Sequence, residues 1–419
     1  MSNYRDVILE ISRKARDAAP YGAVLTAPQK NRILGGMAEA LVAQTDRIVS
    51  ENQKDLKNAQ EKGLSKAMVD RLTLDAKRVA EMANGLREVA ALPDPVGEVV
   101  KGWVRPNGLR VEKVRIPLGV IGIIYESRPN VTVDAAGLCL KSGNAVILRG
   151  GSEAIHSNKV LGEILREVLK ESGAHQDLIQ VLPTTEREAA QFLLEQDSYI
   201  DLIIPRGGEG LMKMVREYSK IPVIRHDKGV CHLFVDYNAD LDMAEKIAIN
   251  AKVQRPGVCN ALETLLVDEK IAHAFLPRMA AEFERLKVEV RGDERARKIV
   301  PELKEAGEAD WSTEYLDLIL SLRVVKDLNE ALSHIRRYGS LHTEAIVTND
   351  ESHAERFLRE VNASVVLVNA STRFNDGSQL GLGAEIGIST TKLHAFGPMG
   401  LEELTTLKYV VRGEGQVRE

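Results

Sequence analysis

Cys259 lies on a predicted turn, where a cysteine can act as a nucleophile. In residues 253–260 a helical pattern ends before Pro256, and a strand pattern follows the cysteine. Pro256 and Gly257 constrain the turn between them. Arg255 favours the thiolate, which is the reactive form of a cysteine. The alternative interpretation is a small buried apolar residue, which is how most unpaired cysteines behave.

The other two cysteines fit the apolar interpretation better. Cys139 stands between Leu138 and Leu140 in a predicted helix, and Cys231 begins a predicted strand. Three cysteines without zinc-site or disulfide spacing are typical of a reducing compartment. The N-terminus lacks an apolar signal segment, and no apolar run reaches the ~20 residues of a membrane span. We therefore expect a cytoplasmic protein with no metal site and no membrane partner.

Two further turns could contact a phosphate. Gly207 and Gly208 follow a strand predicted at 200–204 and precede a helix, where backbone N–H groups bind anions. Arg149 ends another predicted strand and Ser152 follows it; arginine suits phosphate through bidentate hydrogen bonds. The alternatives are an ordinary glycine-rich turn for the first pair, and a surface arginine with a helix-capping serine for the second.

The composition is that of a globular enzyme. The chain has 419 residues, a net charge of −5, 44% hydrophobic residues and 4% aromatic residues. The aliphatic content excludes a disordered chain. The charge argues against a nucleic-acid partner bound through a basic surface, and the few aromatic residues argue against stacking on single strands. The length predicts two or three domains.

The elements that would position these residues form two α/β series. Aliphatic runs alternate with helical patterns, which indicates parallel strands covered on both faces. The first series of strands is predicted at 120–125, 145–149, 179–182, 200–204 and 222–224. The second is predicted at 231–235, 263–267, 320–325, 344–348 and 365–368. The sequence therefore predicts two α/β lobes with Rossmann-like parallel sheets, divided near Asp227-Lys228-Gly229.

Two other segments flank these series. The first hundred residues have a helical pattern, with Ile33, Leu34, Met37 and Leu41 on one face. Residues 99–117 then read as a β-hairpin with a turn at Asn107-Gly108. The hairpin is either an ordinary surface element or an arm that contacts another subunit.

Motifs along nearly the whole chain resemble those of the aldehyde dehydrogenase superfamily. Residues 117–122 are similar to its Pro-Leu-Gly-Val-x-Gly strand entry, and 128–130 to the segment with the oxyanion-hole asparagine. Residues 142–149 resemble the strand that ends at the cofactor's adenosine ribose. Residues 256–259 fall where the catalytic cysteine stands, and 313–316 where a glutamate holds the nicotinamide ribose. The resemblance implies an aldehyde dehydrogenase-like fold.

Longer motifs resemble the branch of that superfamily that reduces γ-glutamyl phosphate. They are residues 125–132, 225–229, 382–390 and 394–400. Hydrolytic members of the superfamily carry a Glu-Leu-Gly-Gly segment whose glutamate activates water. Here the corresponding residues 226–231 lack that glutamate. An enzyme that exchanges an acyl group with phosphate must avoid such a base, so its loss favours a phosphorylating enzyme.

The resemblance implies an activity and a set of site residues. The activity is NADPH-dependent reduction of L-γ-glutamyl 5-phosphate to L-glutamate 5-semialdehyde through a thioester on Cys259, in proline biosynthesis. Asn130 would donate to the oxyanion. The implied cofactor-binding residues are Arg149, Ser152, Gly207, Gly208 and Glu314. Arg128 and Arg255 are candidates to contact the acyl phosphate, with a structural ion pair as the alternative for each.

The resemblance also implies domains and partners. Residues 1–98 and 117–228 would form a cofactor-binding domain and 229–398 a catalytic domain. Residues 99–116 and 399–419 would form an oligomerisation hairpin and tail, the tail pairing with the hairpin of a neighbouring subunit in a homo-oligomer. Association with glutamate 5-kinase would also fit.

Two alternatives stay open. One is a related reductase of another acyl phosphate or of acyl-CoA. The other is a nucleotide-binding scaffold that has lost catalysis, against which the presence of both Cys259 and Asn130 argues.

Overall fold

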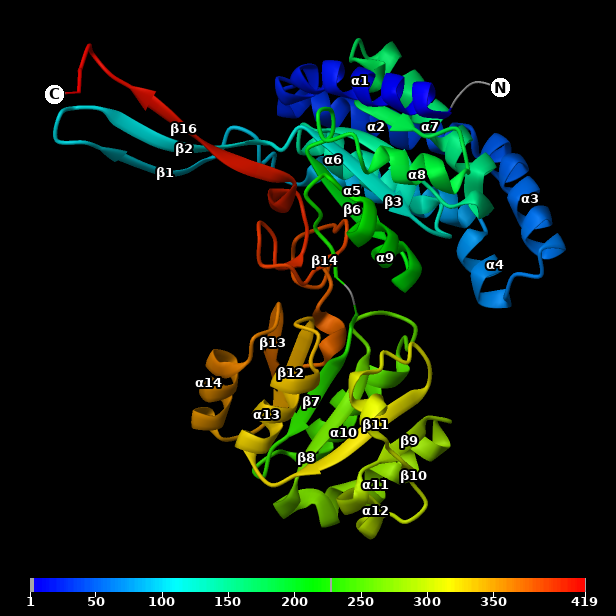
Figure 1. The fold of residues 1–419 in the computed structure, drawn as a ribbon, viewed down its shortest axis with the longest axis vertical. Coiled ribbons are helices and arrows are strands. Elements are labelled where there is room, and N and C mark those ends of the chain that lie inside the picture. Colours follow the sequence, from blue (N-terminus) through cyan, green and yellow to red (C-terminus); the bar gives the residue numbers. More distant parts are fainter. Residues whose placement is uncertain (1–3, 227, 419) are drawn as a thin grey trace. The chain divides into compact units, whose positions relative to one another are not determined.

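The computed structural model describes residues 4–226 and 228–418 (Figure 1), and these form two compact units. Unit 1 contains the chain up to Arg225, residues 382–387 and the tail from Met399. Unit 2 contains the segments from His226 to Gly381 and from Ile388 to Pro398. Asp227, within the predicted lobe boundary, lies outside the described residues. Segment 382–387 clusters with unit 1, whereas the sequence-based division assigned it to the catalytic domain.

Unit 1 begins with amphipathic helices. They are α1 (Tyr4–Ala23), α2 (Ala27–Ala43), α3 (Thr45–Glu61), α4 (Lys66–Leu72) and α5 (Ala76–Ala91). Helix α2 starts after Thr26, whose backbone N–H donates to Gln29 Oε1 at 2.8 Å, as in a capping box. The apolar face predicted for this helix is buried in the structure. The periodicity of the sequence therefore located the face that packs on the core.

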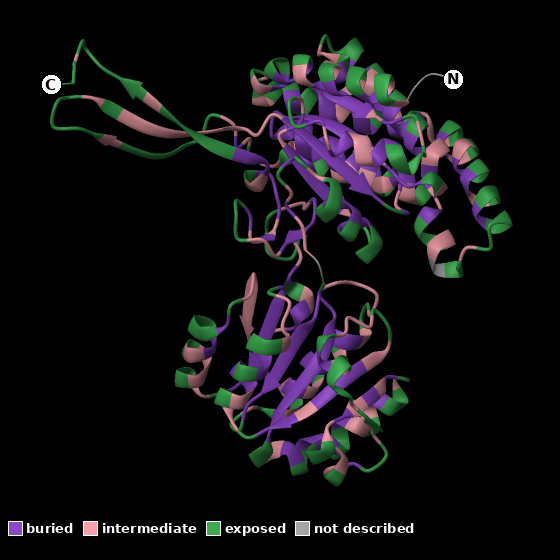
Figure 2. Ribbon diagram, in the orientation of Figure 1, coloured by how far each residue is buried: buried purple, intermediate pink, exposed green. Residues whose placement is uncertain are grey.

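A four-stranded parallel sheet forms the centre of unit 1. Its strands are β3 (Val120–Tyr125), β4 (Ala145–Arg149), β5 (Ile179–Val181) and β6 (Leu202–Arg206), in the order β5-β4-β3-β6. Its helices are α6 (Asn130–Lys141), α7 (Ile155–Glu171), α8 (Arg187–Leu193) and α9 (Glu209–Tyr218). The strands are almost wholly buried (Figure 2). Because β3, β4 and β6 are parallel, the turns that follow them lie at one edge of the sheet.

The strand predicted at 222–224 is reduced to a single bridge between Ile203 and Val223. Pro222 has no N–H to donate, so the segment offers β6 only the Pro222 carbonyl and the Ile224 N–H. That prediction was therefore wrong.

A seven-stranded parallel sheet forms the centre of unit 2. Its strands are β7 (Cys231–Val235), β8 (Leu262–Asp268), β9 (Glu289–Gly292), β10 (Lys304–Glu305), β11 (Ile319–Val325), β12 (Thr343–Val347) and β13 (Val365–Val368), in the order β10-β9-β11-β8-β7-β12-β13. Its helices are α10 (Leu241–Val253), α11 (Glu269–Arg285), α12 (Glu294–Ile299), α13 (Leu328–Tyr338) and α14 (Glu351–Glu360). Strands β9 and β10 were not predicted because both are short and largely polar, as edge strands often are.

A three-stranded antiparallel sheet extends from unit 1. It contains β1 (Val99–Val104), β2 (Arg110–Pro117) and β16 (Thr405–Arg412) in the order β1-β2-β16. Gly108, in the connecting turn, has φ +87°, which favours glycine. Within the chain β16 pairs with β2 from end to end. Because β16 is the outer strand of this sheet, its pairing with a neighbouring subunit stays a prediction.

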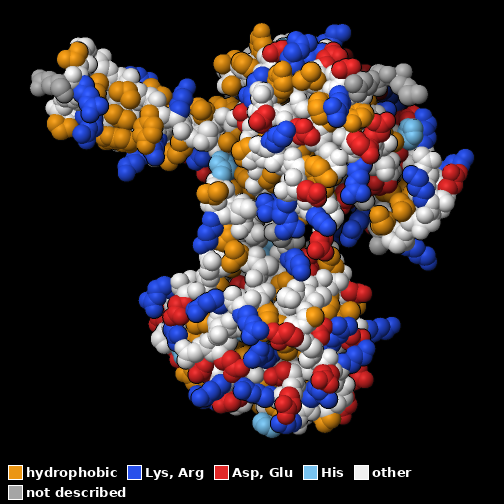
Figure 3. Space-filling model, in the orientation of Figure 1, with side chains coloured by type: hydrophobic (Ala, Val, Ile, Leu, Met, Phe, Trp, Pro, Cys, Tyr) orange, Lys and Arg blue, Asp and Glu red, His pale blue; other side chains and the backbone are white. Residues whose placement is uncertain are grey.

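Apolar side chains remain exposed on this sheet (Figure 3), among them Val104, Tyr409 and Val411. The rest of the fold adds a short pair of strands in unit 2, β14 (Ile388–Ser389) and β15 (Gly397–Pro398). Among the described residues, no helix has the length and apolar character that a membrane crossing requires.

A buried ion pair fixes α2 in unit 1. Lys30 Nζ lies 2.9–3.0 Å from the two oxygens of Asp94, and the Lys30 side chain is fully buried. We expect Asp94→Asn to lower the free energy of unfolding by about 3–5 kcal/mol, because it leaves a buried ammonium without its carboxylate. Urea unfolding at pH 7 measures the loss. The double variant Lys30→Met/Asp94→Asn should lose less, and equal losses in the two proteins would contradict the argument.

Candidate active site

The structure brings the predicted residues of unit 1 to one edge of its sheet. Arg128 and Asn130 follow β3. Arg149 ends β4, and Ser152 lies three residues later. Gly207 and Gly208 follow β6. Arg128, Asn130 and Arg149 are half-buried, whereas Ser152, Gly207 and Gly208 are exposed. The order of parallel strands explains this grouping, because the carboxyl ends of β3, β4 and β6 meet there.

Two carboxylates that the sequence analysis missed lie at the same edge. Gly208 N–H donates to Glu126 Oε2 at 2.9 Å, and a Cβ at Gly207 would lie 2.4 Å from that oxygen. Ser127 donates to Glu153 Oε1 from its backbone N–H at 2.6 Å and from its hydroxyl at 2.7 Å. Glu126 therefore occupies the glycine turn at the start of α9.

Arg149 is electrostatically coupled to these carboxylates. Burial lowers the pKa of Arg149, and the nearby charges of Glu153 and Glu126 oppose that shift. Arg149 Nε is buried and has no hydrogen-bond partner among the described residues, although Nη2 donates to the Thr185 carbonyl at 3.4 Å. The edge thus combines a guanidinium that has an unused donor with two carboxylates. These carboxylates would compete with a bound phosphate for the hydrogen-bond donors.

The Asn130 side chain is held by Asp134, one helical turn further along α6. Asn130 Nδ2 donates to Asp134 Oδ2 at 2.9 Å. A carboxylate accepts hydrogen bonds only, so this contact fixes which end of the amide faces Asp134. Burial raises the pKa of Asp134 to about 6, although the bond from Asn130 and the charge of Arg206 act in the opposite direction. Asp134 is a positioning residue that the sequence analysis missed; its signal was a carboxylate in an otherwise apolar helix.

In unit 2 the Cys259 turn packs directly on Gly229. A Cβ at position 229 would lie 1.9 Å from the Cys259 carbonyl oxygen, so the two backbones touch only because residue 229 is glycine. The Cys231 thiol donates to the same carbonyl, with Sγ and O 3.2 Å apart. Cys259 itself is half-buried, unlike Cys139 and Cys231, which are fully buried.

Glu314 joins this arrangement through Gly229. Burial raises the pKa of Glu314, and the nearby Gly229 N–H and the charge of Lys228 oppose that rise. The structure therefore brings together, within unit 2, Cys259, the glycine of the 226–231 motif and the predicted ribose-binding glutamate.

A buried ion pair sets the position of these two segments. Lys252 Nζ lies 2.7 Å from Glu263 Oε2, and both side chains are fully buried. Glu263 Oε1 accepts the N–H of Leu316 at 3.2 Å, and Leu316 has φ +54°, which is strained for a leucine. The pair thus links the end of α10, just before the Cys259 turn, to the segment of Glu314. The sequence signal was a charged residue inside each of two apolar runs.

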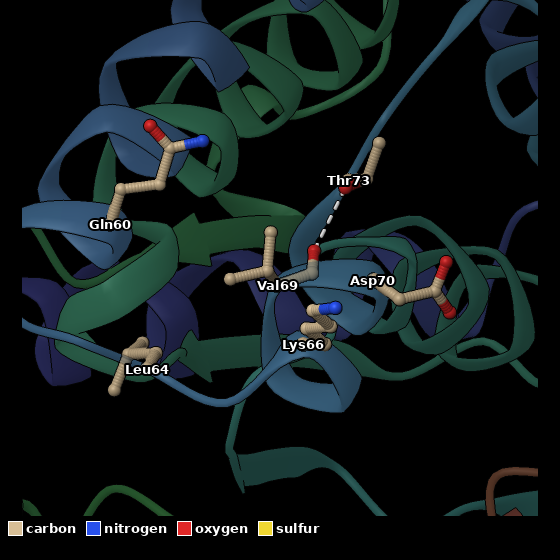
Figure 4. Close-up of a pocket in the computed structure, with 6 residues that line it drawn as sticks. All are labelled: Gln60, Leu64, Lys66, Val69, Asp70 and Thr73. Atoms are coloured by element: carbon tan, nitrogen blue, oxygen red, sulfur yellow. Dashed lines mark hydrogen bonds between the residues drawn. The ribbon is translucent and has the colours of Figure 1, made fainter.

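The remaining candidates have less defined surroundings. Arg255 is exposed on the Cys259 turn. Asn369, directly after β13, bridges to the Thr348 backbone at 2.9 and 3.0 Å and has φ +53°. A surface depression beside α3 and α4 (Figure 4) contains none of the predicted site residues. It is lined by Gln60, Leu64, Lys66, Val69, Asp70 and Thr73.

The contact at Gly229 predicts an unusual sensitivity to one methyl group. We expect Gly229→Ala to destabilise unit 2 by about 1–3 kcal/mol, because the new Cβ forces the Cys259 carbonyl away. Urea unfolding measures the change. Gly210→Ala in α9 is the matched control, because a Cβ there meets nothing within 4 Å. If the two variants unfold alike, the close contact does not constrain the turn.

Comparison with known proteins agrees with this geometry. A model of the aldehyde dehydrogenase family matches residues 5–307. Gamma-glutamyl phosphate reductase from Geobacter metallireducens is 62% identical over 412 residues, covering 98% of this chain and 99% of that protein. Its counterpart from Thermodesulfovibrio yellowstonii is 55% identical over 415 residues, covering 99% of each.

Solved structures show the same relation. The crystal structure of gamma-glutamyl phosphate reductase from Thermotoga maritima has a TM-score of 0.97 at 49% identity, covering 98% of this chain and 100% of that one. An acetylating aldehyde dehydrogenase from Geobacillus thermoglucosidasius shares the fold, with a TM-score of 0.71 at 19% identity, covering 99% and 98%. The resemblance inferred from the motifs is thereby confirmed. The chain belongs to the aldehyde dehydrogenase family, in the group of the γ-glutamyl phosphate reductases.

Proposed function

We propose that this chain reduces L-γ-glutamyl 5-phosphate to L-glutamate 5-semialdehyde and phosphate, a step of proline biosynthesis, through a thioester on Cys259. Relatives that are 62% and 55% identical over nearly the whole chain bear the name of that reaction. The observation that carries the proposal is the meeting of three sequence motifs at Cys259. Gly229 lies against its backbone, and the Glu314 carboxylate lies near the Gly229 N–H.

The chemistry assigned to Cys259 follows from its exposure. The thiolate attacks the acyl carbon, the bond to the phosphate oxygen breaks, and phosphate leaves with the electron pair. Cys139 and Cys231 are fully buried and take no part. After reduction of the thioester, the tetrahedral oxyanion collapses, the C–S bond breaks and the aldehyde leaves. Both tetrahedral stages carry an oxyanion, for which we propose the Asn130 amide and the Cys259 backbone N–H as donors.

The family uses a nicotinamide cofactor, which supplies the hydride when bound. The residues at the sheet edge of unit 1 fit such a group, because Arg149 keeps an unused buried donor and the glycine at 207 lets an acceptor, here the Glu126 carboxylate, approach the backbone of the turn. We assign Arg149 and Ser152 to a 2′-phosphate, which favours NADPH. Gly207 and Gly208 would hold the pyrophosphate, and contact with the Gly208 N–H requires Glu126 to release it.

Assembly of several copies would cover the apolar side chains of the β1-β2-β16 sheet. Val104 is 67% exposed and Tyr409 is 61% exposed. Exposed apolar side chains that lie together on one element often mark a surface that contacts another protein. We therefore propose a homo-oligomer formed through this sheet. Association with the kinase that makes the acyl phosphate stays a prediction.

The reaction run in reverse tests the proposal. NADP⁺ reduction by glutamate semialdehyde should require inorganic phosphate and should be abolished in Cys259→Ala, because phosphate must cleave the thioester. Cys139→Ala is the matched control, since that thiol is buried in α6. Product formation without phosphate would indicate hydrolysis, and dependence on coenzyme A in its place would indicate an acyl-CoA reductase.

Because Asp134 holds the Asn130 amide, we expect oxyanion stabilisation by Asn130 to depend on pH. Asn130→Ala should lower kcat about 10²–10³-fold through loss of an oxyanion donor. In the native protein kcat should fall below pH 6, because protonated Asp134 no longer requires the amide Nδ2 to face it. Asp134→Asn should be slower at neutral pH and should lack that acid limb. A limb that persists in Asp134→Asn belongs to another group.

The same group affects stability with a defined sign. The folded pKa of Asp134 lies above the ordinary value, so the native state binds the proton more tightly than the unfolded chain. The part of the unfolding free energy that comes from protonation of Asp134 is therefore fully present below pH 4, and it is lost as the pH rises through about 6. Asp134→Asn should remove this part of the pH dependence of unfolding.

A further inference from the structure

Arg373, which follows β13, lies against the Cys259 turn of unit 2. Its Nε donates to Gln254 Oε1 at 2.8 Å, and its Nη1 contacts Asn260 Oδ1. Gln254 and Asn260 stand at the two ends of that turn. The guanidinium therefore spans the turn, with Cys259 one residue away from one of its contacts.

The backbone that carries Arg373 is tied to the same turn. Thr372 Oγ1 donates to the Asn260 carbonyl at 2.7 Å, and Asn260 Nδ2 donates to the Asn375 carbonyl at 2.8 Å. Asn375 is itself buried and donates to Thr343 Oγ1 at 2.7 Å. The guanidinium is thus fixed relative to the nucleophile and does not swing freely on an exposed loop.

Within the part of the chain that the structure describes, this guanidinium makes no ion pair. Both of its side-chain partners are neutral amide oxygens, and among the described residues no carboxylate lies within ion-pair distance of Arg373 or Arg255. Asp376 is the nearby acid, but its Oδ1 accepts hydrogen bonds from Ser378 at 2.7 and 3.0 Å. Among the described residues, Arg373 Nη2 has no hydrogen-bond partner.

Electrostatics place Arg255 and Cys259 in the field of Arg373. Burial lowers the pKa of Arg373, the positive charge of Arg255 lowers it further, and the charges of Asp376 and Cys259 oppose both. The repulsion between Arg255 and Arg373 is relieved when an anion binds near both guanidinium groups.

We propose that Arg373 and Arg255 form a subsite that binds the phosphoryl group of the acyl phosphate beside Cys259. This rests on the proposed function. The phosphate oxygen is bonded to the carbon that the thiolate attacks, so the phosphoryl group must lie beside Sγ. Three carbons separate the α-carboxylate of the same substrate from that acyl carbon. A guanidinium that keeps one nitrogen unused offers the charge-assisted donor that a phosphate accepts, and it stabilises the dianion as the P–O–C bond breaks.

Phosphate as a reactant provides the test. In the reverse reaction we expect Arg373→Gln and Arg255→Gln each to raise the KM for inorganic phosphate about 10- to 100-fold, which is the usual effect of losing a hydrogen bond to a charged group. The KM for the aldehyde should stay unchanged. Arg373→Lys should recover part of the loss. Arg359→Gln is the matched control, an exposed arginine of α14 in the same unit.

A measurement without turnover guards against misfolding of the turn. Inorganic phosphate should slow alkylation of Cys259 by neutral iodoacetamide in the native chain and should not do so in Arg255→Gln, whose side chain makes no hydrogen bond to the turn among the described residues. An unchanged KM for phosphate in both glutamine variants would overturn the subsite, as would a raised KM for the aldehyde alone, which would assign the arginines to the α-carboxylate. If the native chain needs no phosphate, the proposed function itself fails.

Discussion

The backbones of Gly229 and Cys259 lie in direct contact, and the arrangement of unit 2 around the cysteine depends on that contact. A Cβ at position 229 would fall 1.9 Å from the Cys259 carbonyl oxygen. The segment before β7 can therefore approach the turn before β8 this closely only because residue 229 is glycine. Glu314 lies near the Gly229 N–H, and the Cys231 thiol donates to the Cys259 carbonyl. Three segments far apart in the sequence are thereby held around one half-exposed thiol.

Buried charges provide the second level of positioning. The Lys252–Glu263 pair joins the helix before Cys259 to the segment of Glu314, and the Lys30–Asp94 pair fixes α2 in unit 1. Such pairs add little net stability over apolar residues of the same size, because desolvation offsets their attraction. Their geometry is nevertheless specific, since a buried charge without its partner is strongly unfavourable. These pairs therefore act as constraints on where the functional segments lie.

The charges around the two sets of site residues differ in sign. The sheet edge of unit 1 has Glu126 and Glu153 on either side of Arg149, so any phosphate bound there must compete with carboxylates. The Cys259 turn of unit 2 has Arg255 and Arg373, with no carboxylate paired to them among the described residues. The proposed division of labour matches this difference: the dinucleotide is bound where acceptors and donors are mixed, and the reacting phosphoryl group where donors alone remain.

The sequence by itself determined most of the elements and the family, and it predicted the nucleophile. Apolar runs located β3, β4 and β7 to the residue, because a strand buried on both faces has a continuous aliphatic pattern, and a similar run located the half-buried edge strand β13. Motif order predicted Cys259, Asn130 and Glu314 as site residues. The short polar strands β9 and β10 left no such pattern and were missed, and the 222–224 run failed as a strand because proline removes a ladder donor.

Only the tertiary structure decided the partners of these residues. That Glu126 fills the Gly207–Gly208 turn and that Arg373 spans the Cys259 turn follow from contacts between segments 82 and 119 residues apart. The pairing of β16 with its own hairpin is decided in the same way. Hydrogen bonds and ion pairs need distances within a few tenths of an ångström. Residue type and spacing along the chain do not specify such distances, whereas the packing of the helices and sheets does.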